Sequence, residues 1–157
     1  MEEIKRLQEN FSLIRRTVGW TTEEFGEKIG VSKMTISNIE TKRHPLSKLQ
    51  YIAIRSVLDA EISNNPEETQ MLYILLDMLI DNPTHYGKKE KEDLLLKANL
   101  ISPSILAGTA SRKEASKEWI KLASAIGGVA LTTLSNPIVI GTVGTWLYKA
   151  LSSKKTK

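Results

Sequence analysis

The sequence contains no cysteine, and its only two imidazoles are His44 and His85. Disulfides, thiolate metal sites and cysteine nucleophiles are therefore excluded, and two histidines are too few for a His-rich metal site. No glycine-rich phosphate loop and no HExxH motif is present, while the glutamate pairs at 23–24 and 67–68 are explained by helix capping and the helix dipole. We therefore expect a protein that is not an enzyme and needs no metal or cofactor.

Positive charge is also scarce where a nucleic-acid partner would need it. The net charge is +4, but residues 1–64 hold 10 Lys/Arg against 9 Asp/Glu, whereas residues 111–157 hold 8 against 2. Overall charge is weak evidence for nucleic-acid binding, so the arrangement of residues must carry that case. The charged N-terminal decapeptide lacks the apolar run of a secretory signal, and we expect a cytoplasmic protein.

Apolar residues recur at helical spacing along the chain, and no alternating strand pattern is evident. Residues 1–64 predict a first unit of four to five helices. Residues 65–100, in which Asn65 and Pro66 begin a helix, predict a helical extension, and residues 101–111 a linker. Residues 112–157 predict a hydrophobic helical hairpin with a basic tail. The fold class is therefore all-α.

The segment from Trp20 to Pro45 predicts two short helices separated by a tight turn. Thr21 and Glu24 form a capping box, Gly30 ends the first helix, and Ser32 caps the second. A small residue at Gly26 lets the two helices approach closely. This layout is typical of a helix-turn-helix, and the second helix keeps short or flexible polar side chains that suit base edges in a major groove.

These residues resemble the phage-repressor or Cro-like family, also called the xenobiotic-response-element helix-turn-helix family. The resemblance covers about residues 4–62 and rests on Arg15, Gly19, the run TTEEFGEKIGVSKMTISNIE, Lys42, Arg43 and Pro45, followed by the apolar positions Leu49, Ile52, Ala53 and Val57. It implies double-stranded DNA as the partner, read by a homodimer on paired half-sites.

The resemblance also implies roles for individual residues. Base contacts are expected from Lys33, Met34, Thr35, Ser37 and Asn38, and phosphate contacts from Thr22, Thr41, Lys42 and Arg43. Arg15 and Glu40 occupy positions that usually form a buried ion pair. Two departures are visible: the family often has Gln at the place of Thr22 and usually has Ala where Gly26 stands, the second being a mild change. Taken alone, Lys42 and Arg43 also fit an ordinary solvated loop.

Two further segments leave alternatives open. Met71–Ile80 is apolar except for Asp77, and it either packs on the first helices or also forms a dimer interface. Leu122–Tyr148 has no charged residue, but Asn136-Pro137 interrupts it. The two halves, Leu122–Ser135 and Pro137–Leu151, would each be about 21–22 Å long as helices, short of a roughly 30 Å hydrocarbon core. Lysines flank both ends, and the positive-inside rule favours a hairpin over a single span.

The hairpin either inserts shallowly at the cytoplasmic face of the membrane, which its length favours, or forms an oligomer core. We therefore predict a sequence-specific DNA-binding transcriptional regulator, a repressor, with a C-terminal segment for membrane association or oligomerisation. The alternative is a membrane-attached scaffold protein whose helix-turn-helix domain binds protein. Salt-dependent binding of a specific duplex discriminates between them.

Overall fold

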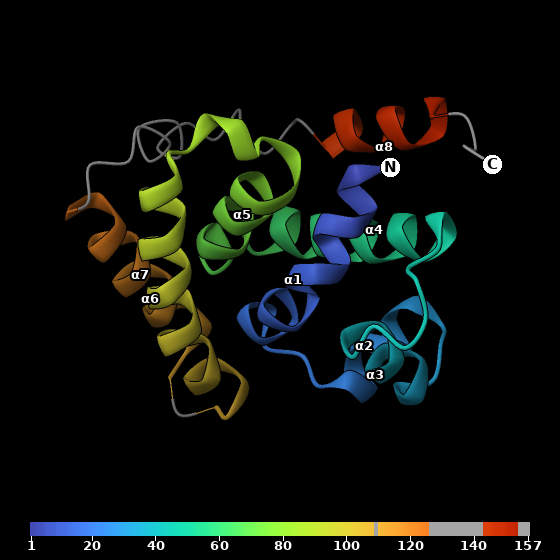
Figure 1. Cartoon of the computed structure of the whole chain (residues 1–157). Coiled ribbons are helices and arrows are strands. Elements are labelled where there is room, and N and C mark those ends of the chain that lie inside the picture. The colour runs from blue at the N-terminus through green and yellow to red at the C-terminus, as the bar shows by residue number, and fades with distance from the viewer. Residues whose placement is uncertain (109, 126–142, 154–157) are drawn as a thin grey trace.

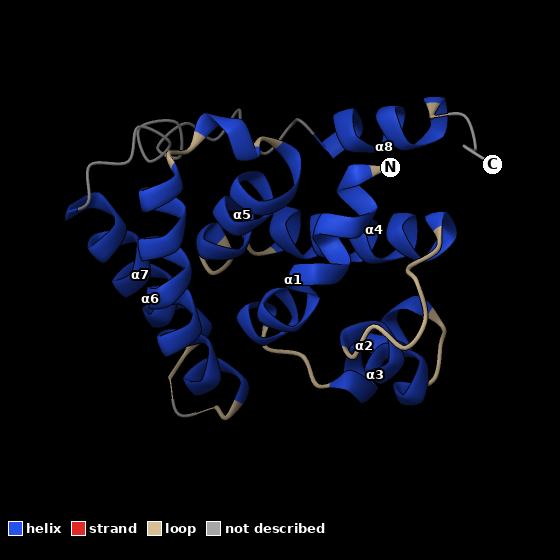
Figure 2. Cartoon of the chain, in the orientation of Figure 1, coloured by secondary structure: helices blue, strands red, loops and turns tan. Residues whose placement is uncertain are grey.

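The structure is a computed structural model that describes residues 1–108, 110–125 and 143–153. Figure 2 shows that every regular element of this part of the chain is a helix, as the predicted all-α class requires. The α-helices are α1 (Glu2–Val18), α2 (Thr22–Ile29), α3 (Lys33–Glu40), α4 (Lys48–Asn64), α5 (Gln70–Leu76), α6 (Lys88–Leu106), α7 (Arg112–Ala125) and α8 (Val143–Ser152). A π-helical turn, Asp77–Asp81, extends α5, and a 3₁₀ turn, Pro83–His85, precedes α6.

Helix α1 lies at the centre of the molecule (Figure 1). The α2–α3 pair lies at one side of it, α5 and α6 pack on the other side, and α7 lies beyond them. Leu7, Phe11 and Ile14 repeat at helical spacing on α1 and are completely buried. Both groups of helices therefore share one continuous core through α1.

The predicted start of α2 at Thr21 and its predicted end at Gly30 are present. The Thr21 and Ser47 hydroxyls each accept the backbone N–H three residues on, and Glu24 and Gln50 return the bond, so both capping boxes are complete. Gly30 ends α2 with a φ of 76°, a left-handed conformation that glycine adopts without steric cost. These caps fix where α2 and α4 begin.

The predicted helix start at Asn65 and Pro66 is wrong. Asn65 ends α4 instead, its N–H donating to the Glu61 carbonyl, and the next helix begins at Gln70. The Thr69 hydroxyl donates to the Asn65 carbonyl at 2.7 Å and closes the intervening turn. Because Asn serves at helix C-termini as well as N-caps, the local pattern alone did not decide the direction.

The apolar segment Met71–Ile80 packs inside the chain. Its large aliphatic residues Met71, Leu72, Ile74, Leu75, Leu76, Met78, Leu79 and Ile80 are all at most 8% exposed. The π turn is held at Asp77, whose carboxylate accepts the Asn82 amide at 2.6 Å and the Tyr86 hydroxyl at 2.7 Å. Packing on α1 therefore buries the face that was also considered for a dimer interface.

The segment predicted as a linker, residues 101–111, is helical as far as Leu106. Pro103 lies inside α6, where it removes one backbone donor. Tertiary contact holds this turn: Ile105 is buried, and the Arg16 guanidinium donates to the Ser102 hydroxyl at 3.2 Å and to the Asn99 amide oxygen at 3.0 Å. Contacts with α1 therefore override the local breaker signal.

Helix α7 packs on α5 and α6, which differs from its expected place in a separate C-terminal hairpin. Trp119 is completely buried and donates its indole N–H to the Leu94 carbonyl at 3.2 Å. At the start of α7, Arg112 donates to Glu61 at 2.7 Å and to Glu68 at 2.6 Å. Deleting residues 112–125 would therefore open the core.

Helix α8 packs on α4 near the N-terminus of the chain, at the opposite end of the molecule from α7 (Figure 1). The turn of the predicted hairpin and most of its two arms fall on residues 126–142, outside the described residues. Among the described residues, no helix combines the length and the apolar character that crossing a bilayer requires.

Candidate nucleic-acid interface

The α2–turn–α3 unit is held by a small aromatic and aliphatic core. Phe25 of α2 contacts Phe11 and Trp20 edge-to-face, with ring centroids 5.1 and 5.3 Å apart. Ile36 and Ile39 of α3 are at most 1% exposed and complete this core. Because the buried side of α3 is fixed in this way, its remaining faces point outward in a defined orientation.

The turn between the two helices is tighter than the sequence indicated. A Cβ at Gly26 would lie 2.6 Å from the Val31 carbonyl oxygen, a distance that real Cβ atoms essentially never show. The Val31 N–H in turn donates to the Gly26 carbonyl at 2.9 Å. Replacing the alanine usual in the family by glycine was expected to be a mild change, but this close backbone approach requires glycine.

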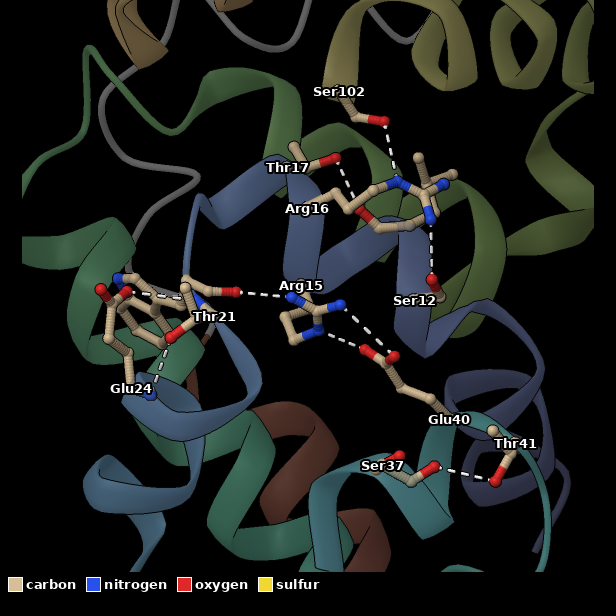
Figure 3. Close-up of polar contacts among 12 residues, drawn as sticks. Ser12, Arg15, Arg16, Thr17, Thr21, Glu24, Ser37, Glu40, Thr41 and Ser102 are labelled. Atoms are coloured by element: carbon tan, nitrogen blue, oxygen red, sulfur yellow. Dashed lines mark hydrogen bonds and ion pairs between the residues drawn. The ribbon is translucent and has the colours of Figure 1, made fainter. Parts of the chain in front are cut away.

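An ion pair anchors the C-terminal end of α3 to α1. Arg15 donates to both carboxylate oxygens of Glu40, Nη2 at 3.3 Å, and its Nη1 donates to the Trp20 carbonyl at 2.9 Å (Figure 3). The two side chains are 11% and 15% exposed. Arg15 thereby neutralises an acidic residue at the end of α3 and ties α1, the α1–α2 turn and α3 together.

The five expected base-contacting residues lie on α3, with different degrees of exposure. Lys33 and Met34 are exposed in its first turn, Met34 at 60%. Thr35, Ser37 and Asn38 are partly buried, and the Thr35 hydroxyl lies 3.1 Å from the Ser32 hydroxyl, within hydrogen-bond distance. The first turn of α3 is therefore its most accessible part.

The expected phosphate-contacting residues gather at the start of α2 and just after α3. Thr22 is the first residue of α2 and is partly buried, whereas Thr41, Lys42 and Arg43 are exposed in the α3–α4 loop. The Thr41 hydroxyl donates to the Ser37 carbonyl at 2.9 Å (Figure 3). Lys42 has a φ of 60°, in the left-handed region that lysine rarely adopts. This backbone turn projects the cationic loop beyond α3.

Gln8 holds the α3–α4 loop and was not singled out from the sequence. Its amide nitrogen donates to the carbonyls of Ile39 at 3.2 Å and His44 at 2.7 Å, and its amide oxygen accepts the Leu46 N–H at 3.0 Å. One side chain of α1 therefore spans the end of α3, the loop and the approach to α4. The only sequence signal was a polar residue beside the buried face of α1.

Helix α4 departs from the apolar pattern that the resemblance implied. Leu49, placed on the apolar face by the resemblance, is 78% exposed, while Arg55 and Asp59 are buried at 2% and 8%. Both charged residues contact Trp146 of α8. No group of three or more His, Asp or Glu side chains in the described ranges is arranged to hold a metal ion.

Comparison with known proteins also identifies the α2–turn–α3 unit. Residues 13–63 match the family model described as helix-turn-helix. The match begins near the end of α1, includes all of α2 and α3, and reaches almost to the end of α4. No curated protein and no solved structure matches the chain.

Proposed function

Residues 13–63 belong to the helix-turn-helix family, and on this premise we propose that the protein is a sequence-specific DNA-binding transcriptional regulator that represses transcription as a homodimer. Helix α3 enters the major groove, where Lys33, Met34, Thr35, Ser37 and Asn38 contact base edges. Thr22, Thr41, Lys42 and Arg43 contact phosphates on either side. The domain is a binding module and carries out no chemical reaction.

One arrangement supports this proposal above the others. The first turn of α3 exposes Lys33 and Met34, and the loop beyond α3 exposes Lys42 and Arg43. The Arg15–Glu40 ion pair fixes α3 beneath them. Polar side chains between two cationic positions match what a groove with phosphates on both sides requires.

Selection of bound duplexes from a random pool by the full-length protein tests the proposal. We expect one enriched sequence, bound at least about a thousandfold more tightly than random DNA, with an affinity that falls as salt rises. Equal binding of all sequences would remove the specific readout. Absence of salt-dependent duplex binding would favour the scaffold that binds protein.

Repression is the regulatory direction that requires least of the rest of the chain. A bound protein that covers a promoter blocks polymerase by occupancy alone. A reporter gene whose promoter overlaps the selected sequence should lose expression when the protein is present. An increase in expression would make the protein an activator.

A homodimer follows from the geometry of readout, because one α3 covers a single half-site and symmetric dimers read two half-sites one helical turn apart. Since the large aliphatic residues between Met71 and Ile80 are buried within the chain, we assign the contact to α6, where Leu96 and Leu100 are 63% and 72% exposed and lie one turn apart. Leu96→Asp with Leu100→Asp should yield a monomer by light scattering. An unchanged mass would place the dimer contact elsewhere.

For the uncharged C-terminal run, protein contact is better supported than membrane attachment. Trp146, within the run, is 7% exposed and is buried against α4, so this side chain cannot occupy a bilayer at the same time. Fractionation of the full-length protein at its native level tests this point. Sedimentation with membranes would restore the membrane-associated alternative through residues 122–148.

A further inference from the structure

Helix α8 packs on α4 through one large side chain. The Trp146 ring contacts the Tyr51 ring edge-to-face at 5.8 Å between centroids and lies 5.0 Å from the Arg55 guanidinium. Its indole N–H donates to the Asp59 carboxylate. Tyr51, Arg55 and Asp59 follow one another at intervals of four along α4, so they form one stripe of that helix.

Most of this stripe is charged or polar. Arg55 donates to both oxygens of Asp81, at 2.7 and 2.8 Å, and its Nε has no hydrogen-bond partner among the described residues. Burying such groups is unfavourable because they lose their hydration, and they regain it when the site opens to water. When α8 leaves, α4 therefore uncovers two charged groups, Arg55 and Asp59, that water solvates well, beside the Tyr51 ring.

The buried tryptophan of α7, Trp119, differs from Trp146 of α8 in its hydrogen-bond partner. Trp119 has no exposed surface and bonds to a backbone carbonyl inside the continuous core. Among the described side chains of α8, only Trp146 and Ala150 are buried, while Tyr148 and Leu151 are 76% and 65% exposed. Few buried apolar contacts mark a segment of low local stability. Detaching α7 would open the core, whereas α8 contributes only Trp146 and Ala150 to it, with Leu147 packed at its edge.

The edges of the contact are also polar and solvent-accessible. Lys149 pairs with the buried Glu3 of α1, and Lys48 donates to the Ser153 carbonyl at 3.2 Å. The lysine of the first pair is 61% exposed, so its charge remains within reach of water. These contacts orient α8 on α1 and α4.

We propose that the Tyr51–Arg55–Asp59 stripe of α4 is an exchangeable docking site whose occupant is α8 of the same chain. The helix leaves and rebinds this site while α1–α7 stay folded. The chain therefore has two states: in one, Trp146 is docked on α4, and in the other, α8 is free to contact other surfaces. This inference does not depend on the DNA-binding proposal, because it concerns a different face of α4.

Hydrogen exchange of the full-length wild-type protein gives the first test and needs no variant. Amides of residues 146–152 should exchange through an opening that denaturant hardly affects, at rates at least about tenfold above those of the α1 and α4 cores. Exchange of α8 only together with these cores would overturn the proposal. Exchange rates that fall with protein concentration would show docking on a second copy and would overturn the assignment to the same chain.

A peptide of residues 143–157 added to full-length Trp146→Ala protein gives the second test. Loss of the indole should free α8, accelerate its exchange and leave α1–α7 unchanged, while Tyr148→Ala, on the exposed side of α8, should behave as wild type. The peptide should bind the Trp146→Ala protein at least about tenfold more tightly than wild type, whose site is already filled. Equal affinity for the two proteins would overturn the proposal.

Discussion

Arg15 of α1 holds Glu40, the last residue of α3, in an ion pair that also reaches the Trp20 carbonyl. The pair joins three segments whose apolar side chains meet in the core around Phe25. An unpaired carboxylate at this end of α3 would repel DNA phosphates. The pair therefore serves both the orientation of α3 and the charge of the face that we assign to DNA.

Breaking this pair should destabilise the domain. Arg15→Ala or Glu40→Ala should each lower the free energy of unfolding by about 3 kcal/mol, because the remaining charge is left largely buried without its partner. The double variant should cost less than the sum of the two. Urea unfolding measures these values, with Glu27→Ala, at an exposed position of α2, as a control expected within about 0.5 kcal/mol of wild type. Strict additivity would show that the pair does not act as a unit.

Sequence readout should depend on Lys33 and Asn38. Replacing either by alanine should cost about 1–3 kcal/mol on the selected duplex and much less on random DNA, because base contacts exist only on the matching sequence. Titration of both duplexes at one salt concentration measures the difference. Lys5→Ala, on the exposed side of the first turns of α1, serves as the matched charge control. Equal losses on both duplexes would assign Lys33 and Asn38 to non-specific contact.

Lys42 allows charge and backbone conformation to be separated. Lys42→Ala and Lys42→Gly should each lower the salt slope of DNA binding by about one unit, since each removes one phosphate contact. Glycine should be more stable than alanine by about 1 kcal/mol, because the left-handed φ of 60° strains any residue with a Cβ. Arg43→Ala should lower the slope without the stability difference. An unchanged slope in all three variants would show that Lys42 and Arg43 belong to an ordinary solvated loop and do not contact phosphate.

Gln8 should position the same loop. Gln8→Ala leaves the Leu46 N–H and the His44 carbonyl without their partner, while the Ile39 carbonyl keeps the Lys42 N–H, and the loss should cost about 1–3 kcal/mol of stability. Binding to all DNA sequences should weaken together, since the cationic loop loses its support. Asn10→Ala, which removes a bond to the Arg6 carbonyl within α1, is the control. Wild-type DNA affinity in a destabilised Gln8→Ala protein would limit Gln8 to a structural role.

The helix-turn-helix was predictable because its signals are local. Thr21, Gly30 and Ser32 each act within four residues of their own position. The local sequence is therefore sufficient to define both ends of α2 and the start of α3. The Arg15–Glu40 contact followed from resemblance, since no local rule connects positions that lie 25 residues apart.

The remaining elements depend on contacts between distant parts of the chain. Pro103 stays helical because Arg16 and the core hold that turn, and the role of Gln8 depends on backbone groups 31 to 38 residues away. Asp59 and Trp146 are 87 positions apart. A charged residue on α4 and a tryptophan in an uncharged run give no sequence signal that they meet, so the docking of α8 on α4 was not predictable.

The docking of α8 should depend on pH through Asp59. Burial raises the pKa of this carboxyl from 3.8 to about 6, and the Arg55 charge and the Trp146 hydrogen bond only partly oppose that rise, to which nearby Asp81 adds. A carboxyl with a higher pKa in the docked state binds its proton more tightly there. The contribution of Asp59 to docking should therefore be greatest below about pH 4 and be lost as the pH rises through about 6. Glu3 acts in the opposite direction and only at lower pH: burial alone would raise its pKa, but Lys149 and Arg6 bring it below 4.5, so its pairing with Lys149 is lost as the pH falls through that lowered pKa.

Exchange of the α8 amides at pH 5 and pH 7, corrected for the intrinsic chemistry of exchange, measures this dependence. Wild-type protection should be about tenfold greater at pH 5, the linkage expected if Asp59 returns to its ordinary pKa when α8 leaves. Asp59→Asn is neutral throughout and keeps an oxygen for the indole N–H, so its protection should be the same at both pH values and at least as high as that of the wild type at pH 7. Because the variant differs from wild type only at this carboxyl, subtracting its profile removes every other titration. An equal pH dependence in the two proteins would exclude Asp59 as the group that controls docking.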